Sequence, residues 1–365
     1  MKKRETLQNN DNTTATTRVQ TIKLGLDVHA DSIVVVRIVD GQTPQPAQRF
    51  SPEKFLEWVK KQLTLAEKVY ACYEAGPLGY SLQRTLSALG LVCYVVRPRD
   101  WDEYGARVKT DGRDAHELAL CLDRYVGGNT KAFCVVRVPT PDQEQRRTRA
   151  RHRQALQNHK QRLAAQGRSH ALYYGHRLTV SNWWKGQAWA ELVQSLPAHL
   201  IDLLSSLRVL LQSIEKELNS WTRQIEQSVA APLPRGVGKL TAQILEREIA
   251  DWSRFKNRRQ VASYTGLCPS EDSSGPRRFQ GHVNKNGNRR VRPLLVECMW
   301  RLVYFQPNYR LVRKWRPLLC APKASGSRRK QIIVAMARQF AVDWWRIRTG
   351  RTTAQSLGLT LNLNA

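Results

Sequence analysis

Alternating β-rich and helical patterns in residues 21–96 constrain the fold of this chain more than any other feature. Thr21–Asp27 and Ser32–Val39 have the pattern of a β-hairpin, and Lys68–Tyr73 and Leu91–Val96 are further apolar runs of strand length. A helical pattern beginning at Ser51 separates the second run from the third, and another separates the third from the fourth. Strands that alternate with helices indicate an α/β domain whose sheet is partly parallel.

Four carboxylates fall where such a fold can gather them. Asp27 and Glu74 end two of the predicted strands, and Asp111 and Asp114 begin a helix that we expect to run to about Arg124, with Asp111 as its N-cap. Ligands bind at the carboxyl ends of strands in open α/β sheets. Grouped carboxylates repel one another unless cations neutralise them, and hard oxygen ligands favour Mg²⁺ or Mn²⁺. A pair of such ions is the usual device for phosphodiester chemistry, although spacing alone fits ordinary caps and strand ends equally well.

The charge of the chain indicates a polyanionic partner. Its 365 residues contain 59 Lys and Arg against 30 Asp and Glu, a net charge of +29, and nucleic acid is the first candidate for such a field. No apolar run has the length of a membrane span, and the N-terminus lacks the apolar region of a signal peptide. We therefore expect a cytoplasmic, nucleoid-associated protein with no membrane partner. Residues 1–19 are expected to form a disordered arm.

A long basic helix is predicted over Pro141–Gly175. Because few acids accompany its cations, the pattern favours contact with phosphate, although such charge runs are usually solvated faces. The predicted contacts on this helix are Arg146, Arg147, Arg149 and Arg153.

A narrow apolar stripe follows in the sequence. Its members recur at alternating spacings of three and four residues, the pattern of a coiled-coil seam. They are Leu204, Leu207, Leu211, Ile214, Leu218, Trp221 and Ile225. We favour self-association through this stripe; the alternative is a helix packed within its own subunit.

The C-terminal part contains two candidate phosphate-binding segments. Leu233–Ala242 has the shape of a helix-hairpin-helix, in which the turn at Gly236 and Gly238, flanked by Arg235 and Lys239, would offer backbone N–H groups. Farther on, a small-residue loop with Ser273 and Ser274 opens into a cationic segment. Its predicted nucleic-acid contacts are Arg277, Arg278, Lys285, Arg289 and Arg290. A serine beside many cations can act as a nucleophile on phosphorus, but no local base is evident and most such segments are simply loops.

These motifs together resemble the DEDD transposases of the IS110 insertion-sequence family, including its IS1111 branch. The resemblance spans roughly residues 20–348. The motifs that carry it are Leu26-Asp27-Val28, Glu74 to Tyr80, Lys109 to Ala115, Pro234 to Ala242, Gly266-Leu267-x-Pro269, Ser274-Gly275, and Lys285-x-Gly287-Asn288 with Arg292. His29-Ala30 and Asn284 depart from the usual family residues, but neither departure replaces one of the four carboxylates or the serine.

The resemblance implies an RNase H-like (RuvC-like) domain over residues 20–138, in which Asp27, Glu74, Asp111 and Asp114 hold Mg²⁺. It implies a basic helix and coiled coil over 139–230, a mostly helical transposase domain with the helix-hairpin-helix and nucleophile Ser274 over 231–350, and a tail over 351–365. It further implies donor and target DNA, a guide (bridge) RNA, and a dimer or tetramer; that two subunits share one active site is a separate hypothesis. The alternatives are a metal-dependent junction endonuclease that forms no covalent intermediate, and a nucleic-acid-binding protein without catalysis.

Overall fold

A computed structural model describes residues 18–97, 110–228, 232–274 and 277–362, except for the side chains of Ser274 and Arg278. The chain divides into two compact units, Met1–Val138 and Pro139–Ala365. Most of the arm predicted over residues 1–19 lies outside the described residues, and its last residue already belongs to the first strand.

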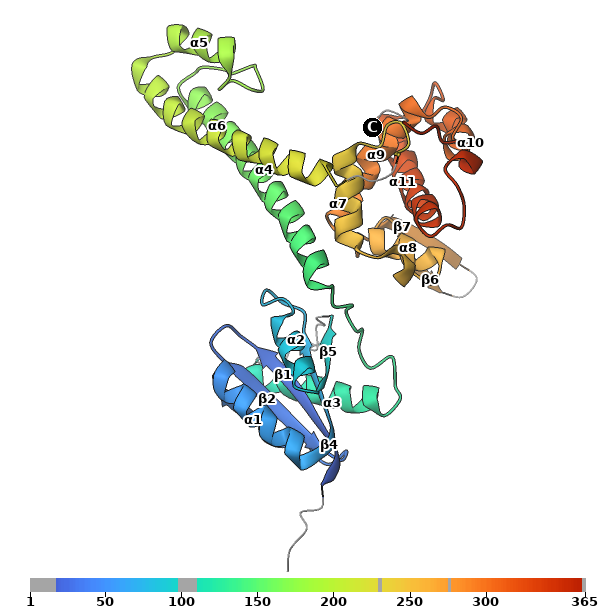
Figure 1. The fold of residues 1–365 in the computed structure, drawn as a ribbon. Helices are drawn as coiled ribbons and strands as arrows, with labels where there is room; N and C mark the ends of the chain where they lie inside the picture. Colours follow the sequence, from blue (N-terminus) through green and yellow to red (C-terminus); the bar gives the residue numbers. More distant parts are fainter. Residues whose placement is uncertain (1–17, 98–109, 229–231, 275–276, 363–365) are drawn as a thin grey trace, which may run out of the picture. The chain divides into compact units, whose positions relative to one another are not determined.

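The first unit is built on a five-stranded sheet with the strand order β3-β2-β1-β4-β5 (Figure 1). The strands are β1 (Val19–Val28), β2 (Ile33–Val39), β3 (Gln48–Phe50), β4 (Ala66–Glu74) and β5 (Val92–Val96). The first three are antiparallel, whereas β4 and β5 run parallel to β1. This mixed α/β arrangement is compatible with the predicted RNase H-like domain.

Three helices cover the sheet: α1 (Pro52–Leu65), α2 (Ser81–Ala88) and α3 (Asp111–Val126). Helix α1 begins where the sequence predicts, because the Ser51 hydroxyl accepts from the amide of Lys54 and Pro52 opens the first turn. Alternate residues of β1 separate the two faces. Leu24 and Leu26 share a buried cluster with side chains of α1 and α2, while Ala115 and Ala119 of α3 cover residues of β2 on the other face.

Gly25 allows α3 to lie directly on β1. A Cβ atom at this position would overlap the carbonyl oxygen of Ala115 and the amide nitrogen of Ala119. Because the neighbouring atoms are backbone, they have no side-chain rotamer with which to make room. The absence of a side chain at Gly25 therefore holds the start of α3 close to the end of β1.

Two long helices dominate the start of the second unit. Helix α4 (Pro141–Tyr173) begins with a capping box between Thr140 and Gln143. It packs against α6 (Ala198–Glu226), with the short α5 (Gly186–Ser195) near the turn between them (Figure 1).

The apolar stripe of α6 packs within its own chain. Leu204 and Leu211 are fully buried, in one cluster with Ala164 and Ala171 of α4 and with Trp183. This burial favours the alternative of a helix packed within its own subunit, because α4 covers these residues. The sequence showed the narrow stripe but not which helix would cover it, and the oligomeric state stays a prediction.

The remainder of the second unit is mostly helical around one large core. Its elements are α7 (Lys239–Ile249), a 3₁₀ turn (Trp252–Arg254), α8 (Arg258–Thr265), β6 (Pro269–Ser274), β7 (Arg277–Val283), α9 (Val291–Phe305), α10 (Arg310–Leu319), α11 (Gly326–Arg348) and a second 3₁₀ turn (Gln355–Leu357). Phe340 and Trp344 of α11 lie in this core with Leu302 of α9. Within the described residues, no helix is both long and apolar enough to cross a membrane.

Two segments of this unit differ from expectation, and a third, the helix-hairpin-helix, stays untested. The serine-bearing segment is an antiparallel hairpin of β6 and β7 rather than a loop. Residues 232–238 form a turn and an isolated bridge from Pro234 to Leu361, so a helix-hairpin-helix around α7 stays a prediction. The predicted tail is not free along its described part, because Leu357 and Leu359 are buried in the core.

Candidate active site

Asp27, His29 and Asp111 converge at the end of β1 and the start of α3. The Nε2 atom of His29 lies 3.1 Å from Oδ2 of Asp27 and 3.7 Å from Oδ1 of Asp111. One ligand atom from each residue lies within 4.8 Å of the other two. The structure thus brings together two of the four predicted carboxylates and adds a histidine, which sequence reasoning noted only as a departure from the family pattern.

Arg49 reaches the same group from the edge strand β3. Asp27 pairs with Val34 of β2, and Val34 pairs with Arg49, so the three residues form one row across the sheet. The Arg49 guanidinium lies 2.5 Å from Oδ2 of Asp111. Sequence reasoning missed Arg49 because only the register of β2 with β3 places it in this row.

Glu74 and Asp114 lie near this group but are not among its three members. Leu26 pairs with Tyr73, so Asp27 and Glu74 each follow one residue later on adjacent parallel strands. Cys72, two residues before Glu74, donates its thiol to the Leu118 carbonyl of α3. Because side chains alternate along a strand, Glu74 belongs to the face that α3 covers.

Asp111 is the first residue of α3 rather than its N-cap, which is Thr110. Asp111 and Asp114 both lie in the first turn of the helix, where a carboxylate interacts favourably with the helix dipole. The expectation of an Asp111 cap is therefore wrong by one residue. This shift leaves its carboxylate free to meet Arg49 and His29.

The two central carboxylates have opposite electrostatic environments. Burial raises the pKa of Asp27; the charge and hydrogen bond of His29 oppose this rise, and the charges of Asp111 and Asp114 add to it. The hydrogen bond from Arg49 is the main cause that lowers the pKa of Asp111, with His29 contributing in the same direction. Asp27 is thus the crowded member of the group, whereas Asp111 is the member that a cationic side chain neutralises.

The chemistry of this donor set fits a divalent cation. Two carboxylates provide hard oxygen ligands, and an imidazole nitrogen is accepted more readily by Mn²⁺ and other transition ions than by Mg²⁺. Arg49 is a competing positive charge at Asp111, so a bound ion would share or displace this contact.

In the second unit, Ser274 is the last residue of β6 and pairs with Arg277 of β7. The side chains of Ser274 and Arg278 lie outside the described residues. The neighbouring hydroxyl of Ser273 donates to a carboxylate oxygen of Glu271 over 3.3 Å. Ser274 and Arg277 thus stand side by side at one end of the hairpin.

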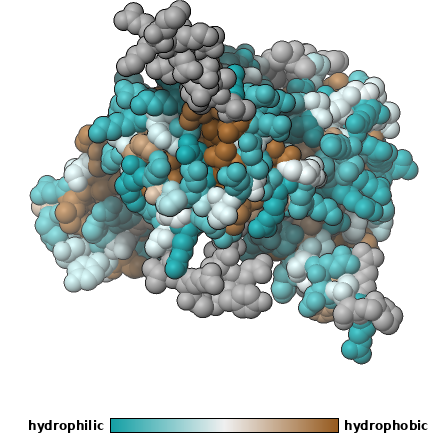
Figure 2. All heavy atoms as spheres, turned by 90° about the horizontal axis from the view of Figure 1, so that it is seen from below, coloured by the Kyte–Doolittle hydropathy of each residue, from teal (hydrophilic) through white to brown (hydrophobic). Residues whose placement is uncertain are grey.

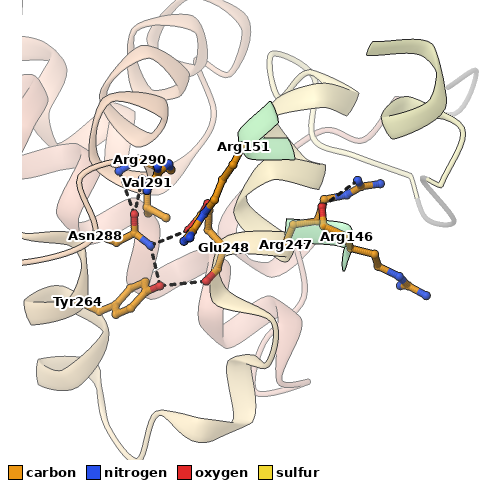
Figure 3. Close-up of polar contacts among 8 residues, drawn as sticks. All are labelled: Arg146, Arg151, Arg247, Glu248, Tyr264, Asn288, Arg290 and Val291. Carbon is orange, nitrogen blue, oxygen red and sulfur yellow. Dashed lines mark hydrogen bonds and ion pairs between the residues drawn. The ribbon is translucent and has the colours of Figure 1, made fainter. Parts of the chain in front are cut away.

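A buried polar network holds the segment that follows this hairpin (Figure 3). Glu248 of α7 is only 2% exposed, and Arg151 of α4 donates two hydrogen bonds of 2.8 Å to its carboxylate. Asn288 donates to Glu248 over 3.2 Å and to the Tyr264 hydroxyl over 2.8 Å, while its Oδ1 accepts from the amide of Arg290. The network therefore ties α4, α7, α8 and the start of α9 together.

Glu248 remains a carboxylate in this setting. Burial alone would raise its pKa, but the hydrogen bonds and charge of Arg151, together with Asn288 and Arg290, lower it overall. The sequence did not reveal Glu248 as a partner, because it lies 97 residues from Arg151.

Part of the basic helix is used to hold the fold. Arg151 and Lys160 form ion pairs with acids of other helices, and Arg153 donates over 2.8 Å to the hydroxyl of Thr222 on α6. Arg153 is thus a packing residue as well as a predicted nucleic-acid contact. Arg147 and Arg149 have no ion-pair partner in the part of the chain that the structure describes.

The remaining predicted nucleic-acid contacts lie in the C-terminal part. Arg235, Lys239, Arg277, Lys285 and Arg289 are exposed, whereas Arg290 is half-buried beside the network. Gly236 has a φ of +96°, and Gly238 is the N-cap of α7. Hydrophilic side chains cover most of the face shown in Figure 2, with apolar ones in smaller patches.

Comparison with known proteins places the chain among transposases. Residues 234–313 match the model of the transposase IS116/IS110/IS902 family. The transposase-family protein y4qE of Sinorhizobium fredii is 32% identical over 79% of this chain and 77% of its own length. The chain belongs to this transposase family.

Two further relatives agree with this assignment. The transposase-family protein y4rJ of Sinorhizobium fredii is 30% identical over 75% of each chain. The transposase for insertion sequence element IS1533 of Leptospira borgpetersenii is 25% identical over 77% of this chain and 85% of its own length. The predicted resemblance to the IS110 family is thereby confirmed, and the protein is a DNA transposase.

Proposed function

We propose that this IS110-family transposase cleaves and rejoins DNA strands by means of a cation-binding carboxylate site and a serine nucleophile, under the guidance of an RNA. The observation that carries the proposal is the convergence of Asp27, His29 and Asp111 beside the start of α3. In a transposase, such a group at a strand end is suited to bind a divalent cation near a phosphodiester.

Asp27, His29 and Asp111 would hold the cation, and Glu74 and Asp114 would complete its surroundings from the same face of the sheet. Mg²⁺ or Mn²⁺ bound there would supply neutralisation of charge on the phosphate oxygens. Arg49 positions Asp111 through their contact and adds a positive charge to the group.

Ser274 would supply the attacking oxygen. Its hydroxyl gives up a proton, a bond forms between Oγ and phosphorus, and the displaced deoxyribose oxygen takes up a proton as its bond to phosphorus breaks. A second hydroxyl from a DNA end then displaces the serine, which restores the enzyme and joins the strands. Arg277, paired with Ser274 across the hairpin, provides positive charge beside the reacting phosphate.

The decisive experiment incubates end-labelled DNA with the protein, the element's noncoding RNA and Mg²⁺, and measures label that stays with the denatured protein. The wild type should form such an adduct, and Ser274→Ala should lose it together with strand cleavage. Ser273→Ala is the matched control and should retain both. Cleavage without any adduct would favour the junction endonuclease, and cleavage that persists in Ser274→Ala would refute the serine role.

The guide RNA is tested by the same reaction. Support for RNA binding comes from the net charge of +29 and from the exposed Arg149 and half-buried Arg147 of α4. Cleavage should require the RNA transcribed beside the gene, and changing its loops should redirect the cut. Equal cleavage without this RNA would contradict guidance.

A further inference from the structure

A polar hollow in the second unit lies at the junction of α4, α7 and α11. Its volume is about 360 Å³. Thr140 and Arg146 of the α4 start, Ser228, Arg247 of α7 and Arg348 of α11 contribute to its wall. None of these residues belongs to the carboxylate group or to the serine hairpin.

Arg247 is a nearly buried cation without a carboxylate partner. It is 9% exposed. Its Nη1 donates to the carbonyl of Arg146 over 3.3 Å and its Nη2 donates to the Ser228 hydroxyl over 3.1 Å. The third nitrogen, Nε, is buried and has no hydrogen-bond partner among the described residues. Figure 3 shows Arg247 beside Arg146, away from the neutralised pair of Arg151 and Glu248.

Each acid that lines the hollow forms an ion pair with an arginine other than Arg247. Asp142 pairs with Arg146 at 3.0 Å, and Glu246 pairs with Arg348 at 2.9 Å. Three arginines therefore face two carboxylates, and the unmatched charge belongs to Arg247. Burial lowers the pKa of Arg247, and the positive charges of Arg146 and Arg149 lower it further.

We propose that this hollow binds a phosphate group of a nucleic-acid backbone through Arg247. A planar guanidinium matches phosphate oxygens in a fork of two hydrogen bonds, and a bound phosphate supplies the counter-charge that the folded chain does not. Arg146, at the same wall, and the nearby Arg149 extend the positive surface along α4. The inference rests on the proposed function only in taking nucleic acid as the ligand.

The first test needs no catalysis. Thermal unfolding is measured in sodium phosphate and in sodium chloride of equal ionic strength. Phosphate should raise the melting temperature of the wild type, because a ligand that binds only the folded state stabilises it, and should not raise that of Arg247→Met. Without ligand, Arg247→Met should melt at or above the wild type, because it removes a buried charge that has no partner.

The second test measures binding of labelled single-stranded RNA, single-stranded DNA and duplex DNA in EDTA over a range of salt concentrations. Arg247→Met should weaken binding about tenfold for the nucleic acid that occupies the hollow and reduce its salt slope by about one. Arg223→Gln, which removes an exposed charge of the adjacent α6, is the matched control and should have a smaller effect.

The nucleic acid whose binding is weakened most by Arg247→Met is the one that supplies the phosphate. A melting temperature of the wild type that phosphate does not change would overturn the proposal. So would equal losses of affinity in Arg247→Met and Arg223→Gln for all three nucleic acids. Because EDTA prevents cleavage, a failed Ser274 experiment would leave this result unaffected, and the reverse also holds.

Discussion

At the scale of single residues, Asp27 and Asp111 of the candidate site differ in their electrostatic environments. Burial and like charges oppose ionisation of Asp27, whereas Arg49 favours ionisation of Asp111. Pairs of titratable groups whose environments separate their pKa values are typical of catalytic sites. A bound cation would favour the charged form of Asp27, whose pKa burial raises.

Replacing Asp27 with Asn separates stability from function. Asn keeps the shape and a hydrogen bond to His29 but removes the crowded charge, so the free energy of unfolding should rise by up to about 1 kcal/mol in the absence of metal. Cation binding and strand cleavage should be lost. Calorimetric titration with Mn²⁺ and thermal unfolding measure the two effects.

The control is Asp31→Asn, which removes an exposed carboxylate from the turn after β1. It should leave both cation binding and stability nearly unchanged. Mn²⁺ affinity that survives in Asp27→Asn would contradict the assignment of Asp27 as a ligand.

Sequence reasoning found the site residues whose positions depend on local order. Asp27 and Glu74 end strands, and Asp111 begins a helix. The pattern of strands and helices alone therefore predicts that these residues meet at one edge of the sheet. Arg49 could not be found in this way, because its place depends on how β3 pairs with β2. The partners of the Glu248 carboxylate were equally hidden, since Arg151 and Asn288 lie 97 and 40 residues from it in the sequence.

At the scale of elements, the contact of α3 with β1 fixes the carboxylates in place. Gly25→Ala should force α3 away from the sheet and cost about 1–3 kcal/mol or more of stability, with a loss of cation binding. Gly112→Ala is the matched control, because its Cβ would meet only the Ala47 side chain at 3.4 Å. Thermal unfolding measures the melting temperatures of the two variants. Equal melting temperatures of Gly25→Ala and Gly112→Ala would show that α3 can move away from β1 without a loss of stability.

The α4–α6 pair depends on burial of one stripe of α6. Leu211 is fully buried, whereas the adjacent Leu210 is 51% exposed. Leu211→Ala should reduce the free energy of unfolding of this pair by about 2–5 kcal/mol, and Leu210→Ala should change it by less than about 0.5 kcal/mol. Tryptophan fluorescence reports the transition, because Trp183 and Trp184 lie in the same cluster.

Equal losses of unfolding free energy in Leu211→Ala and Leu210→Ala would contradict this packing. A change of oligomeric state in Leu211→Ala without loss of stability would favour the interpretation that the stripe joins two copies.

The elements that sequence predicted well carry strong local signals. The capped start of α1 and the alternating strands of the first unit are examples. The β6–β7 hairpin escaped prediction because Pro269–Ser274 is polar and lacks alternation, so only pairing with β7 makes it a strand. The sequence could not identify the partner of the α6 stripe, because periodicity reveals an apolar face but not what covers it.

At the scale of the whole molecule, the two units have different parts in the proposed reaction. The first holds the carboxylates, and the second contains the serine hairpin, the basic helix and the hollow at Arg247. Most of the excess positive charge of the chain lies in the second unit, which suits a unit that contacts nucleic acid. In the proposed reaction, the second unit provides the covalent link to DNA through Ser274.

Peptide mapping of the protein–DNA adduct tests this claim most directly. The adduct formed with DNA, RNA and Mg²⁺ is digested with protease and nuclease, and mass spectrometry identifies the residue that carries the nucleotide. We predict a phosphodiester on Ser274. A nucleotide on any other residue, or cleaved DNA with no adduct at all, would contradict the account.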